Sequence, residues 1–306
     1  PGPGAVIPEW FSEQKEYFGR GDEDYTKLKK KTLNWLKKIS GQDEIIPIPG
    51  AGTTAAIVAF NTFLNGRIAV LKTGYYSKRW YDCLKGYKNL SKVKYIDYQD
   101  FIKLDKLKKF DWVVFVYVET ASCKKFDLPL VKKICTNSKI RLMIDSTASI
   151  GLEINHILGD VIFFSSCKGL FGPTGLGFIA YKKKIKKKHA NNFLLDYRSH
   201  QDSKYTLGYN CMASLYAISK KHRYFKKKII FAGNYLKQFT LFNINNPKIG
   251  IALKYKLKKR KNSKSIFYIP REKKTYDVIF FLGIIKYDQK DIKKILKDRI
   301  IKNLKL

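Results

Sequence analysis

The chain has 306 residues and 45% of them are hydrophobic, so it is long enough to bury the core of one large domain and a smaller one. Its formal net charge is +36, but the basic residues are spread from Lys27 to Lys305 and come with no RNP, zinc-finger or helix-turn-helix signature. We therefore expect no specific nucleic-acid partner, and we expect the positive field to steer small anionic substrates inward.

The cysteines and histidines argue against a metal centre. The five cysteines form no CxxC pair, and the four histidines show no ligand spacing. An odd, scattered set of cysteines is typical of a reducing compartment, so a cytoplasmic protein is expected. No apolar run approaches about 18 residues and no charged-then-apolar leader is visible, so we expect neither a membrane span nor a secretion signal.

The first two thirds of the chain alternate between helical and strand patterns. Apolar residues recur at helical spacing from Tyr25 to Ser40, and Gly41 is expected to end that helix. Strands are then expected at residues 45–48, 67–72, 112–118, 141–145 and 161–164, with a helix at 55–64. This rhythm predicts an α/β domain with a largely parallel sheet and helices on both faces. In such sheets the ligand site lies off the carboxyl ends of the strands.

The pattern changes beyond about Phe231. Lysine-rich strands are expected at residues 249–255, 265–269 and 278–284, followed by a helix at 289–303. The sequence therefore predicts a large domain of residues 15–231 and a small α+β domain of residues 232–306.

An acid and a lysine follow two of the predicted neighbouring strands. Asp145 ends one strand, and Lys168 follows the next strand 23 residues later, with one helix and one strand expected between them. Pyridoxal phosphate (PLP) chemistry needs such a pair: a carboxylate that keeps the pyridine nitrogen protonated and a lysine that holds the cofactor as a Schiff base. The competing interpretations are an aspartate that caps the next helix and an ordinary lysine in a lysine-rich chain. The small residues and the Gly/Pro-rich turn around Lys168 favour the catalytic interpretation.

A glycine-rich turn precedes the helix at 55–64. In Gly50-Ala51-Gly52-Thr53-Thr54, the glycines permit close approach of the backbone, and the N–H groups of the first helical turn are free to bind a phosphate. Taken alone, such a turn is more often just a tight strand–helix connection. It lacks the GK[ST] ending of a Walker A loop, which argues against a nucleoside triphosphatase.

Residues 141–181 resemble the class V, fold-type I aminotransferases, especially the branch that holds 2-aminoethylphosphonate:pyruvate and alanine:glyoxylate transaminases. The resemblance extends over nearly the whole chain. It implies that Gly52 and Thr53 bind the cofactor phosphate and that Thr147 faces the cofactor ring. It also implies that Tyr76 stacks on this ring, with Tyr75 as the competing assignment. Thr120 matches the residue that hydrogen-bonds near the 3′ oxygen, although a helix N-cap is its other interpretation.

The resemblance also implies a shared active site. Tyr205 and Thr206 resemble the segment that reaches the cofactor phosphate of a neighbouring subunit, which would make the protein a homodimer. The opening Pro1-Gly2-Pro3-Gly4 resembles the family's Asn-Pro-Gly-Pro start, so residues 1–14 are expected beside the substrate pocket.

The chain departs from the family at three positions. Ala51 replaces a serine of the phosphate loop, and Cys167 stands where a polar residue is usual before the lysine. Phe281 occupies the position of the arginine that forks onto the substrate carboxylate in relatives. Either another cation takes over, with Arg271 the first choice and Arg20 the second, or the substrate lacks an α-carboxylate there, or transaminase activity has been lost.

The resemblance implies a PLP-dependent aminotransferase. We expect it to move an amino group between 2-aminoethylphosphonate, or a similar small amine, and pyruvate or a like keto acid in a ping-pong cycle. The alternatives are an alanine/serine:glyoxylate-type transaminase and a degenerate PLP-fold protein without transaminase activity. A PLP lyase or desulfurase is disfavoured because no ring-stacking histidine is present.

Overall fold

The computed structural model describes residues 4–14, 19, 21–104, 107, 109–201, 208–242, 246–258, 267–268 and 276–305. Four of the predicted site residues, Arg20, Tyr205, Thr206 and Arg271, lie outside the described residues.

A seven-stranded sheet forms the centre of the larger part of the molecule, in the order β1-β9-β8-β7-β4-β2-β3. Its pairs are parallel except those of β9, which runs antiparallel to both β1 and β8. The predicted, largely parallel sheet is therefore confirmed. The strands are β1 (Glu44–Gly50), β2 (Gly66–Lys72), β3 (Leu90–Asp97), β4 (Trp112–Val116), β7 (Arg141–Asp145), β8 (Val161–Ser165) and β9 (Gly175–Tyr181).

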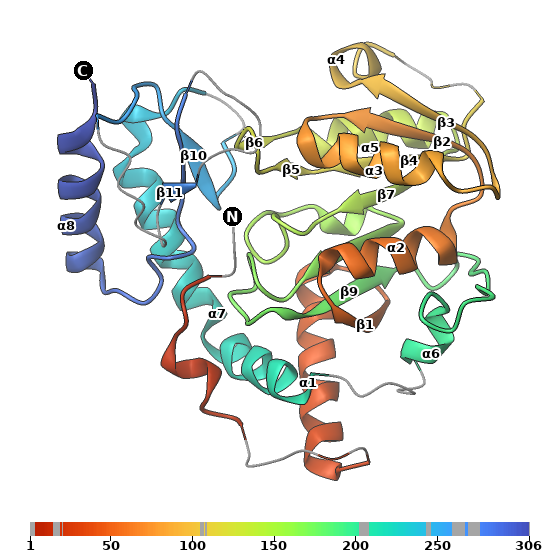
Figure 1. Ribbon diagram of the computed structural model, residues 1–306, viewed down its shortest axis with the longest axis horizontal. Coiled ribbons are helices and arrows are strands. Elements are labelled where there is room, and N and C mark those ends of the chain that lie inside the picture. Colours follow the sequence, from red (N-terminus) through yellow and green to blue (C-terminus); the bar gives the residue numbers. More distant parts are fainter. Residues whose placement is uncertain are drawn as a thin grey trace.

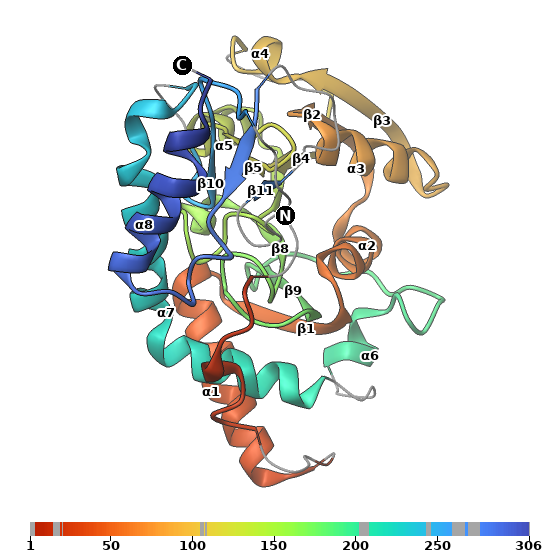
Figure 2. The same ribbon diagram turned by 60° about the vertical axis from the view of Figure 1, so that its left-hand side comes forward.

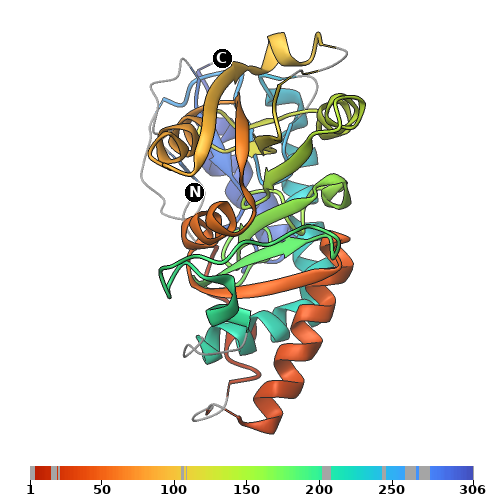
Figure 3. The same ribbon diagram turned by 90° about the vertical axis from the view of Figure 1, so that its right-hand side faces the viewer.

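Helices cover both faces of this sheet (Figure 3), because successive side chains of each buried strand point to opposite sides. In β4, Val114 packs in the cluster with α2 and α3, whereas Val113 and Phe115 pack in the cluster with α1 and α5. The α-helices are α1 (Glu23–Ser40), α2 (Gly52–Phe63), α3 (Tyr75–Lys85), α4 (Tyr98–Phe101), α5 (Leu128–Asn137), α6 (Tyr197–Gln201), α7 (Tyr209–Tyr235) and α8 (Gln289–Arg299). Short 3-10 helices are η1 (Pro8–Trp10), η2 (His156–Leu158), η3 (Lys237–Phe239) and η4 (Ile301–Asn303).

The boundaries of α1 follow from its end residues. Asp22 accepts a hydrogen bond from the Tyr25 N–H, as an N-cap does, and Gly41 ends the helix with a left-handed φ of 66°. The predicted helix and its stop at Gly41 are confirmed. No helix in the described part of the chain is long and apolar enough to cross a membrane.

A three-stranded antiparallel sheet lies beside α8 at the left of Figure 1, apart from the seven-stranded sheet. Its order is β10-β12-β11, and a separate hairpin is formed by β5 and β6. The long helix α7 packs against both α1 and α8 and runs unbroken through the expected domain boundary after Phe231. These strands are β10 (Gly250–Ala252), β11 (Phe267–Tyr268), β12 (Val278–Phe280), β5 (Val118–Glu119) and β6 (Lys124–Lys125).

The connection between Asp145 and β8 differs from the prediction. An α-helix was expected there, but the segment is a series of turns that contains only η2. Gly151 (φ 78°) and Asn155 (φ 71°) adopt left-handed conformations, which cannot continue a right-handed helix. A β-carbon on Gly151 would approach the Gly169 carbonyl oxygen to 2.7 Å, so the turn lies tightly against the segment that follows Lys168.

Beyond its first residues, the N-terminal segment runs along α7, on which η1 packs (Figure 2). The Gly4 N–H donates to the Cys167 carbonyl at 3.2 Å, and the Ala5 N–H donates to the Leu282 carbonyl at 3.2 Å. Trp10 adds a bond from its indole Nε1 to the Phe171 carbonyl at 2.8 Å. The segment thus ties the turn around Lys168 to the small sheet.

Candidate active site

The predicted cofactor residues of the large sheet meet at one cavity of about 210 Å³. Its lining includes residues at or just beyond the carboxyl ends of β1, β4, β7 and β8, which is where ligands bind in open α/β sheets. All seven of the predicted site residues that are described line it: Gly52, Thr53, Tyr76, Thr120, Asp145, Thr147 and Lys168.

Asp145 is held in place by two N–H donors. It is 6% exposed, and its Oδ1 accepts from the Thr147 backbone N–H at 2.9 Å while its Oδ2 accepts from the Trp80 indole Nε1 at 2.8 Å. A carboxylate that only accepts matches two N–H donors. Lys168 is partly buried in the same cavity, so the acid and the amine share one space as the sequence predicted.

Tyr76 presents its ring to Lys168. The Lys168 Nζ lies 5.3 Å from the centroid of this ring, within the range of a cation–π contact. Tyr75 packs edge-on against Tyr76, with ring centroids 5.3 Å apart, and is not among the cavity residues. Of the two tyrosines considered from the sequence, Tyr76 is the one at the cavity.

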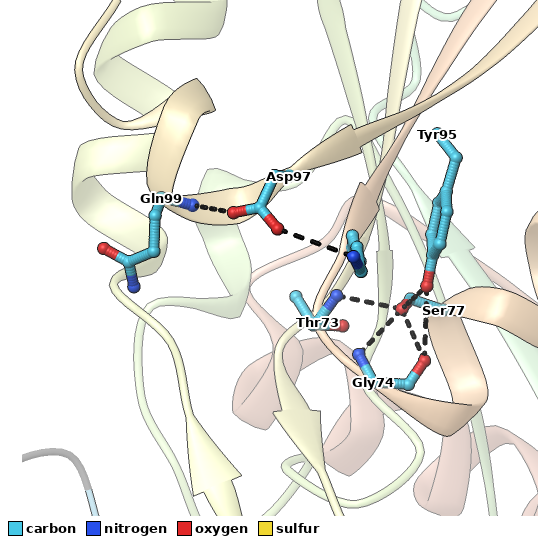
Figure 4. A network of polar contacts seen from close by, with 7 residues as sticks. Thr73, Gly74, Ser77, Tyr95, Asp97 and Gln99 are labelled. Atoms are coloured by element: carbon cyan, nitrogen blue, oxygen red, sulfur yellow. Dashed lines mark hydrogen bonds and ion pairs between the residues drawn. The ribbon is translucent and has the colours of Figure 1, made fainter.

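The start of α3 is fixed by a polar network around Ser77 (Figure 4). The Ser77 Oγ accepts from the backbone N–H groups of Thr73 and Gly74, both at 2.9 Å, and lies 3.0 Å from the Tyr95 hydroxyl. The Tyr76 N–H donates to Oε2 of the buried Glu119 at 2.8 Å. These bonds determine where the first turn of α3 places the Tyr76 ring.

Glu119 also orders the turn that holds Thr120. Its Oε1 accepts from the Ala121 N–H at 2.9 Å, so one carboxylate joins the start of α3 to this turn. Thr120 is 1% exposed, and its Oγ1 is buried without a hydrogen-bond partner among the described residues. No helix begins at Thr120, so the N-cap interpretation is wrong. A buried hydroxyl without a partner at a cavity is suited to a bound ligand.

The start of α2 forms a cradle for an anion. Its N-cap residue, Ala51, makes no side-chain cap, and the first N–H groups of a helix have no carbonyl partner within it. A β-carbon on Gly177 of β9 would lie 2.6 Å from the Ala51 carbonyl oxygen, so glycine is needed for α2 to pack this closely. A β-carbon on Gly52 would come within 3.1 Å of the Thr147 Oγ1, which shows that these two cavity residues adjoin.

Among the cavity residues that sequence reasoning did not assign to the site are Arg79 and Trp80. They stand three and four positions after Tyr76 on α3, and residues at this spacing share one helix face. Helical spacing from Tyr76 could have identified them. The guanidinium of Arg79 lies over the Trp80 ring, 5.4 Å from its centroid. Among the described residues, Lys168 and Arg79 are the cations that line the cavity.

Phe281 is not among the residues that line the cavity. It is fully buried in the apolar cluster of the small sheet, α7 and α8, and its N–H donates to the Ile249 carbonyl at 2.9 Å. Phe281, which the resemblance matches to the family's arginine, is thus a core residue.

The site fits pyridoxal phosphate. The cavity combines the Asp145 carboxylate as a hydrogen-bond acceptor, the Lys168 amine and the Tyr76 ring. It also holds the buried Thr120 hydroxyl, which has no partner among the described residues, and the N-terminus of α2, which suits a phosphate. Among the described residues, no group of three His, Cys, Asp or Glu side chains could hold a metal ion. Fold and cavity together define a fold-type I protein of the PLP-dependent class.

The comparisons assign the family. The family model of class V aminotransferases matches residues 12–232, so this chain belongs to the class V aminotransferase family, which implies pyridoxal phosphate as its cofactor. A 2-aminoethylphosphonate–pyruvate transaminase of Pseudomonas aeruginosa is 24% identical over 206 residues, which cover 61% of this chain and 53% of the relative. The chain spans about half the length of the curated relatives it matches.

Solved structures agree on the fold. An aspartate aminotransferase of Thermus thermophilus has a TM-score of 0.78 at 16% identity, covering 98% of this chain and 99% of its own. An alanine–glyoxylate aminotransferase of Nostoc sp. has a TM-score of 0.76 at 14% identity, covering 96% and 93%. At such low identity these likenesses concern the fold alone.

Proposed function

We propose that this chain transfers an amino group between a small amine and a keto acid, with 2-aminoethylphosphonate and pyruvate as the first candidates. The observation that carries the proposal is the cavity shared by Lys168 and Asp145, with the Tyr76 ring 5.3 Å from the Lys168 Nζ. The curated relatives, which carry the name 2-aminoethylphosphonate–pyruvate transaminase, supply the candidate substrates.

Each cavity residue is assigned one task. Lys168 would hold the cofactor and, once its amine is free, would take the proton from the substrate carbon that bears the amino group and deliver it to C4′ of the cofactor. Asp145 accepts a hydrogen bond from the ring nitrogen, and Tyr76 covers one face of the ring. When bound, PLP supplies an electron sink for the charge that develops at that carbon.

The remaining residues hold the cofactor in place. Gly52 and Thr53 bind its phosphate through backbone and hydroxyl donors at the start of α2. Thr147 faces the ring, and the Thr120 hydroxyl bonds to the ring's oxygen substituent. Gly52 and Thr120 are buried, which strengthens the polar contacts that they make.

Recognition of the substrate's anionic group is assigned to arginines. Arg79 lines the cavity in the structure, and the sequence nominates Arg271 and then Arg20. A bidentate guanidinium would orient a phosphonate or carboxylate. Since Phe281 is buried, a donor without an α-carboxylate, such as 2-aminoethylphosphonate, suits this site.

The proposal extends to assembly and location. We assign residues 15–231 to a large cofactor-binding domain and 232–306 to a small domain, with residues 1–14 beside the site. Tyr205 and Thr206 would reach the cofactor phosphate of a second copy in a homodimer. The five cysteines are unpaired, which suits a reducing, cytoplasmic location.

A second candidate is a protein that binds PLP without turnover, and Phe281 favours it, because the resemblance matches this buried ring to the family's carboxylate-binding arginine. A panel of amine donors separates the two. We expect 2-aminoethylphosphonate to bleach the visible band of the bound cofactor and pyruvate to restore it. Bleaching by alanine or serine alone, with recovery by glyoxylate, would favour the alanine/serine:glyoxylate type. A band that no donor bleaches would support the second candidate.

A further inference from the structure

Trp80 forms a direct bond to the acid of the proposed site. Its indole Nε1 donates to the Asp145 Oδ2 at 2.8 Å, and the two side chains come from α3 and from the end of β7. Trp80 is 3% exposed and Asp145 is 6% exposed, so bulk water competes little for either partner. A hydrogen bond to a charged group in such a setting is among the stronger ones in proteins.

The Trp80 ring has little freedom to move. It packs edge-on against Phe60 of α2, with centroids 5.6 Å apart, and edge-on against Phe163 of β8, also at 5.6 Å. The guanidinium of Arg79 lies over its ring. The direction of the Nε1–H is therefore fixed by packing from three elements.

The two donors to Asp145 hold it from different sides of its carboxylate. The Thr147 N–H binds Oδ1 and belongs to the turn after β7, whereas the Trp80 N–H binds Oδ2 and belongs to α3. With both oxygens engaged by N–H donors, the torsion of the carboxylate is set. The lone pairs that remain can accept one further donor, such as a ring N–H.

We propose that Trp80 is a positioning residue that fixes the Asp145 carboxylate for the nitrogen of the PLP ring. This inference rests on the proposed role of Asp145. Trp80 would then strengthen PLP binding through its hydrogen bond to the Asp145 Oδ2, in addition to any effect of its packing.

A double-mutant cycle on PLP affinity tests the inference. Trp80→Phe keeps an aromatic ring and removes the donor, and we expect it to raise the Kd for PLP about tenfold, as for loss of one charge-assisted hydrogen bond. In an Asp145→Ala background the same substitution should change the Kd less than about twofold, because the acceptor is already gone. An equal loss in both backgrounds would mean that Trp80 acts by packing, and the inference would fall.

Trp112→Phe is the matched control. The Trp112 indole also donates a hydrogen bond, a partly buried one, to Asn65 Oδ1 at 3.1 Å, but Trp112 is not a cavity residue. It should leave the Kd for PLP unchanged. Thermal unfolding of each variant without cofactor separates a folding defect from a binding defect.

A second readout is the pH titration of the bound cofactor's visible band. Its midpoint should move in Trp80→Phe and stay in Trp112→Phe, because only the first alters the acid beside the ring nitrogen. An unmoved midpoint together with an unchanged Kd would contradict the inference. Failure of the unsubstituted protein to bind PLP would instead overturn the proposed function itself.

Discussion

The Lys168 amine lies over the face of the Tyr76 ring, 5.3 Å from its centroid. A flat cofactor carried on that amine therefore has an aromatic surface beside it. Tyr76 is held there from its backbone, because Glu119 accepts its N–H and the same carboxylate binds the turn that contains Thr120. The buried Glu119 therefore fixes both the Tyr76 ring, which faces Lys168, and the turn that carries the Thr120 hydroxyl.

Thr120→Val tests the unpartnered hydroxyl. Valine has nearly the same shape and leaves no buried oxygen unsatisfied, so the cofactor-free protein should keep or gain stability. PLP binding should weaken about fivefold, since one neutral hydrogen bond contributes about 1 kcal/mol. The measurements are urea unfolding without cofactor and the Kd for PLP.

Thr73→Val is the control for that substitution. Within the described part of the chain the Thr73 Oγ1 is also buried without a partner, but Thr73 is not a cavity residue. Its replacement should leave the Kd unchanged. If both variants weakened PLP binding equally, the Thr120 hydroxyl would have no special role in holding the cofactor.

Gly177→Ala tests the packing of the phosphate cradle. The new methyl group would lie 2.6 Å from the Ala51 carbonyl oxygen and 2.8 Å from the Ala55 Cβ, so α2 must move away from β9. We expect a loss of about 1–3 kcal/mol in the free energy of unfolding and weaker PLP binding. Gly233→Ala in α7 is the contrast, because its methyl group would meet Phe281 at an ordinary 3.7 Å. A Gly177→Ala protein with unchanged stability and affinity would show that the close approach of α2 is not required.

Three histidines, His156, His200 and His222, are buried with lowered pKa values, and they make stability depend on pH. Burial lowers the pKa of His222 to about 4 and that of His156 to about 3, and the Lys226 charge acts in the same direction on both. The unfolded chain takes up these protons below about pH 6.5, whereas the folded protein does so only near the lowered values. Stability should therefore be full above pH 6.5 and should fall by about 1.4 kcal/mol for each of His156 and His222 on reaching pH 5.5.

His222→Gln separates the contribution of one imidazole. His222 Nε2 lies 2.9 Å from the Gly169 carbonyl oxygen, next to Lys168, and the glutamine amide retains a donor without titrating. Urea unfolding at pH 7.5 and 5.5 should show a pH-dependent loss that is smaller by about 1.4 kcal/mol in this variant. An undiminished loss would mean that His222 does not contribute to it.

The site could be predicted where a strand end fixed the position of a residue. Asp145 ends β7 and Lys168 follows β8, and the two strands are parallel neighbours whose register pairs Asp145 with Phe163. Because both residues stand at the carboxyl end of a strand, their meeting at one edge of the sheet could be predicted. Gly52 and Thr53 followed from the same rule, because a helix that starts after a strand places its first turn at that edge.

Contacts between elements could not be predicted in the same way. The bond from Trp80 to Asp145 joins residues 65 positions apart and depends on how α3 leans on the sheet. The expected helix before β8 is absent because Gly151 and Asn155 adopt left-handed conformations. The spacing of apolar residues in the sequence does not predict such backbone conformations. The burial of Phe281 depends on packing between α7, α8 and the small sheet.

The most direct test of the account is borohydride reduction of the protein with bound PLP, followed by peptide mass spectrometry. The account predicts a yellow protein in which the cofactor becomes fixed on the peptide that contains Lys168, and a Lys168→Ala variant that carries no fixed cofactor. A Lys168→Ala protein with cofactor still attached to another lysine at full occupancy would contradict it.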